Sequence, residues 1–260
     1  MCVNLACIGV FDSGVGGLTV AAALRQALPS VDLHYVADSA HAPYGERDAE
    51  FIQARSLTIA GHLRDKGARL LVMACNTATA HAAQVVRERF PDLPVVGIEP
   101  GVKPAVLASR NGRVGVLATT ATVHSARFKR LLETHAAGAQ VLAVACTGLV
   151  AAIEAGELDS PTVRELVERY SQQLRDAGVD TALLACTHYP LLMPLWQAAL
   201  PGVSLLRIEP AVALQAKRLW AWGDGAAKLT LESTGDPELL RQMAGRALGI
   251  APLSANFLTL

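Results

Sequence analysis

Two cysteines, Cys75 and Cys186, are the residues of this sequence best suited to reactive chemistry. Each follows an apolar run and opens a helical pattern, in LLVMACNTATA (70–80) and ALLACTHYPLL (182–192). A thiol at a helix N-terminus has a lowered pKa, so a thiolate is accessible near neutral pH. One such cysteine alone would be typical of packing, because cysteine is often buried as a small apolar residue. Two in matching positions indicate a pair of thiols that take and return protons.

Polar residues follow both thiols. Asn76 and Thr77 come after the first and can donate to or accept from a carboxylate or an ammonium group. Thr187 and His188 come after the second, and an imidazole two residues from a thiol could exchange its proton or set its charge. A histidine at a strand end is, by itself, typical of a structural hydrogen bond. The combination with the thiol favours a functional interpretation.

A glycine-rich turn, FDSGVGG (11–17), follows the first apolar run. Its glycines would let backbone N–H groups converge on an anion beside the positive end of the next helix. It is not a P-loop, and Thr19 stands where a dinucleotide fingerprint has its third glycine. The alternative is a tight turn in which Ser13 caps the helix. Asp12 favours function, because an acid at the carboxyl end of a strand points into the cleft.

The other candidate residues indicate loops or packing. The turn APYG (42–45) could line a cleft. Cys146 is interpreted as structural, and Cys2 and Cys7 as packing residues. No pocket motif surrounds the lysines, so a pyridoxal phosphate Schiff base is not expected. No metal is expected either, because metal-ligand spacing is absent from the remaining histidines, His34, His41, His62, His81, His124 and His135.

Short apolar runs alternate with helical patterns in two series. Strands are predicted first at 5–11, 32–37, 70–74 and 95–98, with helices at 18–28, 47–66 and 77–90. The second series has strands at 113–118, 141–145, 181–185 and 204–208, with helices at 122–134, 149–155, 162–177, 191–200 and 211–222. Apolar strands in such alternation predict parallel sheets covered on both faces. We therefore expect an α/β fold of two pseudo-symmetric α/β lobes with mainly parallel sheets and an active site in the cleft between them.

Composition excludes several other classes. The 260 residues are 52% hydrophobic and 18% charged, which predicts a compact globular protein. Lys+Arg and Asp+Glu are 23 each, so no basic surface for nucleic acid is expected. No signal peptide and no membrane span is evident. Five cysteines without a CxxC pair are typical of free thiols in the cytoplasm.

The motifs together resemble those of the glutamate racemases, in the aspartate/glutamate racemase family. The resemblance covers roughly residues 8–215, and the motifs occur in the family's order. They are FDSGVGGLTV (11–20), PYGER (43–47), ACNTATA (74–80), GIEPG (97–101), TTATVHS (119–125) and CTHYPLL (186–192).

The resemblance implies a role for each matching residue. Cys75 and Cys186 would be the two acid/base thiols, with Asp12 assisting the first and His188 the second. Cys186 would deprotonate L-glutamate and Cys75 D-glutamate, with no cofactor and no metal. The implied substrate-binding residues are Asp12, Ser13, Pro43, Tyr44, Gly45, Cys75, Asn76, Thr77, Thr119, Thr122, Glu154, Cys186, Thr187 and His188.

The resemblance also implies a division into lobes and a cellular role. Residues 1–98 with 209–260 would form the first lobe, and residues 99–208 the second. The product, D-glutamate, would be used for peptidoglycan, and hence for cell wall biogenesis and cell shape, in the cytoplasm. A homodimer is left open.

The sequence departs from the family at three places. Cys146-Thr147 stands where the family has Cys-Pro, and Arg207-Ile208-Glu209 where a strand usually ends in Asp. Asp38-Ser39 replaces a GDTA-like segment. These departures put loop details in doubt and leave the thiol motifs intact. A racemase of aspartate or a related amino acid, and a non-catalytic binding protein of the same fold, are the alternatives.

Overall fold

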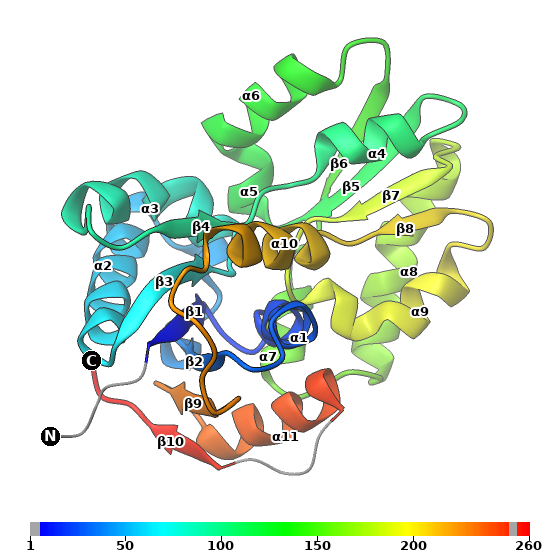
Figure 1. The fold of residues 1–260 in the computed structure, drawn as a ribbon. Coiled ribbons are helices and arrows are strands. Elements are labelled where there is room, and N and C mark those ends of the chain that lie inside the picture. Colours follow the sequence, from blue (N-terminus) through cyan, green and yellow to red (C-terminus); the bar gives the residue numbers. More distant parts are fainter. Residues whose placement is uncertain (1–5, 250–253) are drawn as a thin grey trace, which may run out of the picture.

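The computed structural model describes residues 6–249 and 254–260, which fold around two parallel sheets (Figure 1). The first sheet has the strand order β10-β9-β2-β1-β3-β4, and the second has the order β6-β5-β7-β8. Every strand pairing in both sheets is parallel. The fold class expected from the sequence, α/β with two parallel-sheet lobes, is confirmed.

The first sheet has helices on both faces. Its strands are β1 (Cys7–Asp12), β2 (Asp32–Ala37), β3 (Ala68–Met73), β4 (Val95–Gly97), β9 (Leu229–Ser233) and β10 (Ala255–Phe257). Its helices are α1 (Leu18–Ala27), α2 (Ala49–Asp65), α3 (Asn76–Arg89), α10 (Glu209–Leu219) and α11 (Pro237–Leu248). Along β1, Ile8 and Val10 pack with α1, whereas Cys7 and Phe11 pack with α2 and α3. Apolar side chains on both faces explain the continuous apolar run.

The second sheet is smaller and is surrounded by shorter helices. Its strands are β5 (Arg113–Ala118), β6 (Gln140–Ala145), β7 (Thr181–Leu184) and β8 (Ser204–Leu206). Its helices are α4 (Val102–Ala108), α5 (Thr120–His124), α6 (Ala126–His135), α7 (Leu149–Glu154), α8 (Pro161–Asp176) and α9 (Met193–Ala199). Three 3-10 segments complete the fold, η1 (Ser39–His41), η2 (Tyr44–Glu46) and η3 (Tyr189–Leu192). No helix in the described part of the chain is long and apolar enough to span a bilayer.

Capping residues account for two differences from the predicted helices. The helix expected at 122–134 is divided into α5 and α6, because Ser125 is extended and its side chain accepts from the Phe128 N–H to cap α6. The helix expected from residue 47 begins at Ala49, where the Asp48 side chain accepts from the Phe51 N–H. The strand expected at 5–11 begins at Cys7, while residue 5 and Cys2 lie outside the described residues.

The C-terminal segment returns to the first sheet. Strand β9 pairs with β2, and β10 pairs with β9. These two strands, α4 and α11 have no counterpart among the predicted elements. The lobe limits at residues 98/99 and 208/209 remain our proposal.

Candidate active site

Cys75 lies directly after β3 and is the N-cap of α3. Its sulfur accepts from the Ala78 N–H at 3.4 Å and lies 3.7 Å from the Ser13 hydroxyl. Burial, followed by the negative charge of Asp12, raises the pKa of the thiol to about 12. The sequence predicted a lowered pKa from the helix N-terminus, and that prediction is wrong here. Loss of solvent disfavours the thiolate more than the helix end favours it.

Cys186 follows β7 and lies next to an ion pair. Its sulfur is 3.8 Å from His188 Nδ1, and His188 Nε2 is 2.6 Å from Glu154 Oε1. Burial alone would lower the pKa of His188, but hydrogen bonds to Cys186 and Glu154 outweigh it and raise the pKa well above its ordinary value. The imidazole is therefore held as an imidazolium between a sulfur and a carboxylate. The sequence associated Glu154 with the substrate, whereas its nearest partner is His188.

Asp12 joins the two strand ends. It is fully buried at the end of β1, where one oxygen accepts from the Gly14 N–H at 2.9 Å and the other from the Thr187 hydroxyl at 3.0 Å. Burial raises the pKa of Asp12, and His188 opposes that shift. The carboxyl group thus links the turn after β1 to the segment that carries the second thiol.

Gly14 and Gly16 let the turn approach these groups closely. A Cβ at Gly14 would lie 2.0 Å from Glu154 Oε1, and one at Gly16 would lie 2.2 Å from His188 Nδ1. The sequence predicted backbone donors for an anion, and two of them bind the protein's own carboxylates. The Gly14 N–H donates to Asp12, and the Val15 N–H donates to Glu154 at 2.7 Å. Helix α1 begins with Gly17 as its N-cap, so Ser13 does not cap it.

Both thiols line one small cavity of about 20 Å³. Asn76 indicates that a ligand binds in this cavity, because its side chain is buried, at 4% exposed, and neither its Oδ1 nor its Nδ2 has a partner in the described part of the chain. Asp12, Thr122 and Glu154, also expected at the substrate, lie behind the lining and contact it. The lining residues are Ser13, Pro43, Tyr44, Gly45, Cys75, Asn76, Thr77, Thr119, Val150, Cys186, Thr187 and His188.

Threonine hydroxyls connect the two lobes at one side of the cavity. Thr77 Oγ1 lies 3.0 Å from Thr119 Oγ1 and 3.4 Å from Thr122 Oγ1. Thr119 is also the N-cap of α5 and accepts from the Thr122 N–H. The three hydroxyls therefore lie together, one from α3 and two from the segment after β5.

The Pro43–Gly45 loop depends on a buried carboxylate that the sequence did not single out. Tyr44 donates its hydroxyl to Asp38 at 2.5 Å, so only its ring and backbone are available to a substrate. Arg55 of α2 donates to both Asp38 oxygens, at 3.0 and 2.8 Å. Burial raises the pKa of Asp38, but the bonds from Arg55 and Tyr44 outweigh it and lower the pKa. The only sequence signal for this role of Asp38 was an acid at the end of an apolar run, shortly before a Pro-Tyr-Gly turn.

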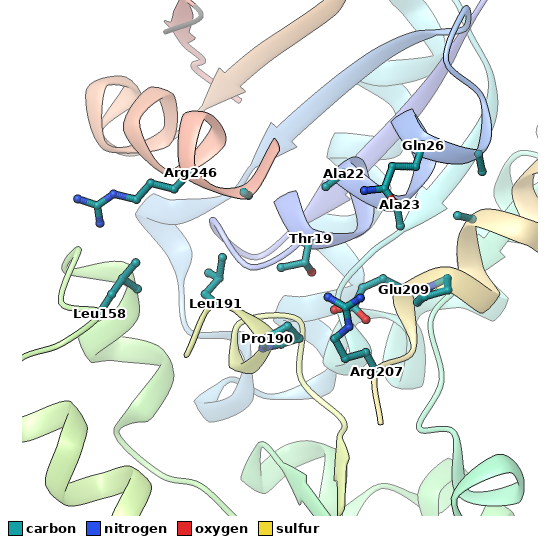
Figure 2. A pocket seen from close by; sticks show the side chains of 14 residues that line it. Thr19, Ala22, Ala23, Gln26, Leu158, Pro190, Leu191, Arg207, Glu209 and Arg246 are labelled. Atoms are coloured by element: carbon teal, nitrogen blue, oxygen red, sulfur yellow. The ribbon is translucent and has the colours of Figure 1, made fainter. Parts of the chain in front are cut away.

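A larger pocket, of about 520 Å³, contains none of the predicted site residues (Figure 2). It lies between α1, the Pro190–Leu191 segment and the start of α10, with Arg207 and Glu209 on its wall (Figure 2). The Thr19 hydroxyl donates to the Thr187 carbonyl at 3.3 Å, so the pocket adjoins the candidate site from behind. Because it holds neither thiol, the chemistry is assigned to the smaller cavity.

Comparison with known proteins agrees with this site. The pattern of Asp/Glu/Hydantoin racemases matches residues 18–218, most of the chain. This chain belongs to the Asp/Glu/hydantoin racemase family. The family expected from the sequence is confirmed, as is the enzyme class, an isomerase that racemises amino acids.

Several similar proteins are glutamate racemases. That of Ectopseudomonas mendocina is 54% identical over 213 residues, covering 82% of this chain and 81% of the relative. That of Pseudomonas aeruginosa is 51% identical over 220 residues, covering 84% and 83%. The crystal structure of Bacillus anthracis RacE1 has a TM-score of 0.86 at 30% identity and covers 98% of both chains. That of the Escherichia coli enzyme, in complex with L-glutamate and an activator, has a TM-score of 0.87 at 30% identity and covers 97% of both.

Proposed function

We propose that this protein is a cofactor-independent glutamate racemase that moves the α-proton with two cysteines. The observation that carries the proposal is that Cys75 and Cys186 line the same cavity from the strand ends of two different sheets. Thiols that approach one carbon from two sides can remove a proton from one face and deliver another to the opposite face. Relatives at about 50% identity that are glutamate racemases support glutamate as the substrate.

The surroundings of the two thiols indicate which one acts as the base and which as the acid in the resting enzyme. The raised pKa of Cys75, about 12, keeps that residue a thiol at neutral pH, whereas the sulfur of Cys186 lies beside the His188 imidazolium. The resting enzyme is then ready for L-glutamate, with Cys186 as base and Cys75 as acid. For D-glutamate the roles are reversed.

The remaining residues bind the substrate and stabilise its charge. The Asn76 amide, which has no partner among the described residues, and the hydroxyls of Thr77 and Thr119 would hold the two carboxylates and the ammonium group. Donors fixed in a dry site stabilise the developing enediolate-like charge better than water does. Asp12 and Thr187 would set the protonation of the first thiol and the position of the second.

Proton exchange with solvent tests the proposal directly. The protein is incubated with L-glutamate in D2O, with a chelator and without pyridoxal phosphate. We expect the optical signal to decay to zero and deuterium to enter the α-position of the D-glutamate formed. Aspartate under the same conditions tests the related racemase, and glutamate binding without exchange would identify a binding protein instead.

Substitution of the thiols tests the two-base mechanism. Cys75→Ala and Cys186→Ala should each reduce racemisation by at least about 100-fold, the ordinary contribution of an acid or base. Cys146→Ala is the matched control, because Cys146 is also buried beyond a strand end but lies outside the cavity lining. Full turnover by either active-site variant would refute the mechanism.

The cellular role is part of the same proposal. D-Glutamate made in the cytoplasm would supply peptidoglycan synthesis, cell wall biogenesis and cell shape. The balanced charge supports a small-molecule substrate rather than nucleic acid. Expression in a bacterium that needs external D-glutamate should restore growth, and a strain carrying Cys75→Ala should still need the supplement.

A further inference from the structure

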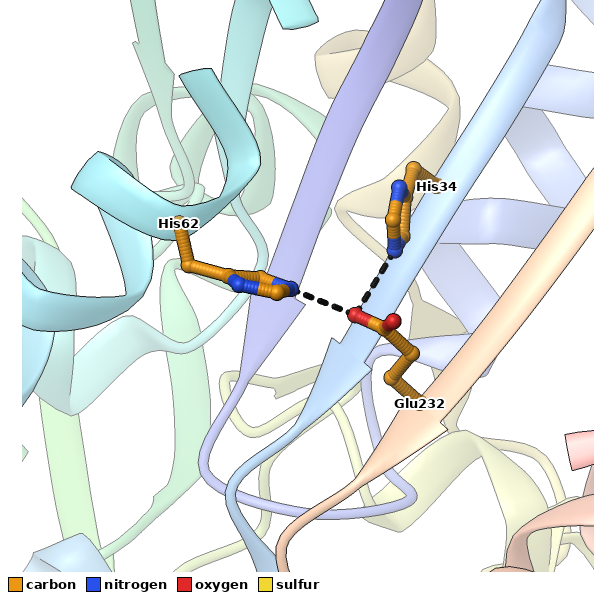
Figure 3. Close-up of side chains that lie close together, drawn as sticks. All are labelled: His34, His62 and Glu232. Carbon is orange, nitrogen blue, oxygen red and sulfur yellow. Dashed lines mark hydrogen bonds and ion pairs between the residues drawn. The ribbon is translucent and has the colours of Figure 1, made fainter. Parts of the chain in front are cut away.

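A cluster of two histidines and a glutamate lies on the first sheet, apart from the candidate active site. His34 comes from β2, His62 from α2 and Glu232 from β9 (Figure 3). Both imidazole Nε2 atoms contact the same oxygen, Glu232 Oε2, at 2.8 Å from His34 and 2.6 Å from His62. One potential ligand atom from each residue lies within 4.8 Å of the others. None of the three lines the cavity that holds the thiols.

The fold brings these residues together from distant parts of the sequence. In the register of β2 and β9, His34 pairs with Thr230 and Val36 with Glu232, so His34 and Glu232 are diagonal neighbours on one face. On the next strand the partner of His34 is Gly9. A Cβ at Gly9 would lie only 3.1 Å from Leu63 Cβ, so this glycine lets α2 approach, and His62 precedes Leu63. Sequence spacing could not reveal such a set.

We propose that His34, His62 and Glu232 bind a divalent transition metal ion, with Zn²⁺ the best fit. Two imidazoles and a carboxylate are a donor set that Zn²⁺ accepts, with water in the fourth position. Ligand atoms about 2.1 Å from the ion stand roughly 3.4 Å apart in a tetrahedron, so the Glu232 oxygen must move back from the two imidazoles by about 0.6–0.8 Å. The side chains are 10–13% exposed, which leaves an entry path and restricts solvent.

The geometry points to a structural role for the ion. It would join β2, β9 and α2, and so fasten the returning C-terminal segment to the first sheet. Two residues after Glu232, the Thr234 hydroxyl donates to Asp38 at 2.9 Å, the carboxylate that holds Tyr44. The site is separate from the proposed reaction, which we expect to continue in chelator-treated protein.

Binding of Zn²⁺ alone, measured by calorimetry on chelator-treated full-length protein, tests the proposal. We expect one equivalent to bind to the wild type, with at least a 10-fold loss of affinity in His62→Gln and in Glu232→Gln. His124→Gln is the matched control, because His124 is exposed and lies outside the cluster. Cys75→Ser controls for metal binding by the active-site thiol. Both controls should bind Zn²⁺ like the wild type.

Thermal unfolding gives a second measurement that does not depend on activity. At 100-fold excess over its dissociation constant, a ligand of the folded state raises the Tm of a chain this long by about 5–10 °C. The increase should occur in wild type, His124→Gln and Cys75→Ser, and be absent from His62→Gln. The proposal is overturned if the cluster variants bind and respond like wild type, if the wild type binds no Zn²⁺, or if only Cys75→Ser loses the ion.

Discussion

The two thiols occupy equivalent places at strand ends, but their immediate partners differ. Cys75 faces a hydroxyl and a buried carboxyl group, whereas Cys186 faces an imidazole that is paired with Glu154. An imidazolium favours a thiolate, and a nearby carboxylate disfavours one. The proposed two-base mechanism needs one thiolate and one thiol in each direction, and we propose that this difference between their partners sets the starting protonation state. If both thiols had the same partners, neither would be favoured as the thiolate.

Glu154→Gln tests the ion pair with His188. The wild-type pair raises the folded pKa of His188 above 6.5. Its contribution to stability is therefore complete below pH 6.5 and is lost as pH rises through the folded pKa. We expect the variant to be about 3 kcal/mol less stable at pH 6, since one partner of a buried pair is removed. The difference should shrink as pH rises. Urea unfolding from pH 6 to 10 measures it, and a difference independent of pH would contradict the assignment.

At the scale of elements, the Pro43–Gly45 loop is positioned by groups outside it. The Asp38 carboxylate, which precedes η1, accepts hydrogen bonds from Arg55 of α2 and from Thr234, which follows β9. Three separate elements therefore determine where Tyr44 lies. We expect changes at Asp38 to affect substrate binding without any contact to the substrate.

Asp38→Asn should cost about 3 kcal/mol of stability, because it removes the charge that balances buried Arg55. Its KM should rise at least about 5-fold with a smaller change in kcat, since the loop loses its position while the thiols keep theirs. Tyr44→Phe removes one hydrogen bond and should shift KM in the same direction by less. Asp48→Asn, which keeps a cap for α2, is the control. A fall in kcat with unchanged KM would argue against a positioning role for Asp38.

At the scale of the whole molecule, the sequence predicted the parts that depend on local pattern. Continuous apolar runs predicted the strands β1, β3 and β7, and the residues at or just beyond their carboxyl ends include the candidates Asp12, Cys75 and Cys186. Contacts between lobes could not be predicted in this way. The bond from Glu154 to the Val15 N–H joins residues 139 positions apart and depends on how two sheets are placed.

The elevated pKa of Cys75 was missed for a related reason. Helix position is visible in the sequence, but complete burial and the charge of Asp12 arise only when β1 and β3 lie side by side. The C-terminal strands were missed because β9 and β10 are short and gain their stability from pairing with β2 and with each other. Tertiary context, rather than local propensity, decides both cases.

We expect the lobes to move apart during turnover, because the cavity that holds both thiols is small. A volume of about 20 Å³ has room for about one water molecule, so an amino acid can enter only when the walls separate. Gly45 and Thr119 face each other across this opening, with a Cβ at Gly45 lying 3.0 Å from Thr119 Cβ. A disulfide has a Cβ–Cβ distance of roughly 3.5–4.5 Å, so one can form here after a separation of about 0.5 Å. A cross-link here would hold the cavity shut.

The reduced double variant Gly45→Cys/Thr119→Cys should already be less active than the wild type, because it lacks the Thr119 hydroxyl. When its new disulfide forms, kcat/KM should fall by at least about another 10-fold relative to the same protein in its reduced form. The reduced form of the same protein controls for the substitutions, and oxidised wild type controls for damage to Cys75 and Cys186. Reduction should restore activity, because the bond alone prevents opening. Glutamate racemisation before and after mild oxidation, with the cross-link verified by mass spectrometry, measures the effect. Equal kcat/KM in the cross-linked and reduced forms would show that substrate reaches the thiols without separation of the lobes at this point.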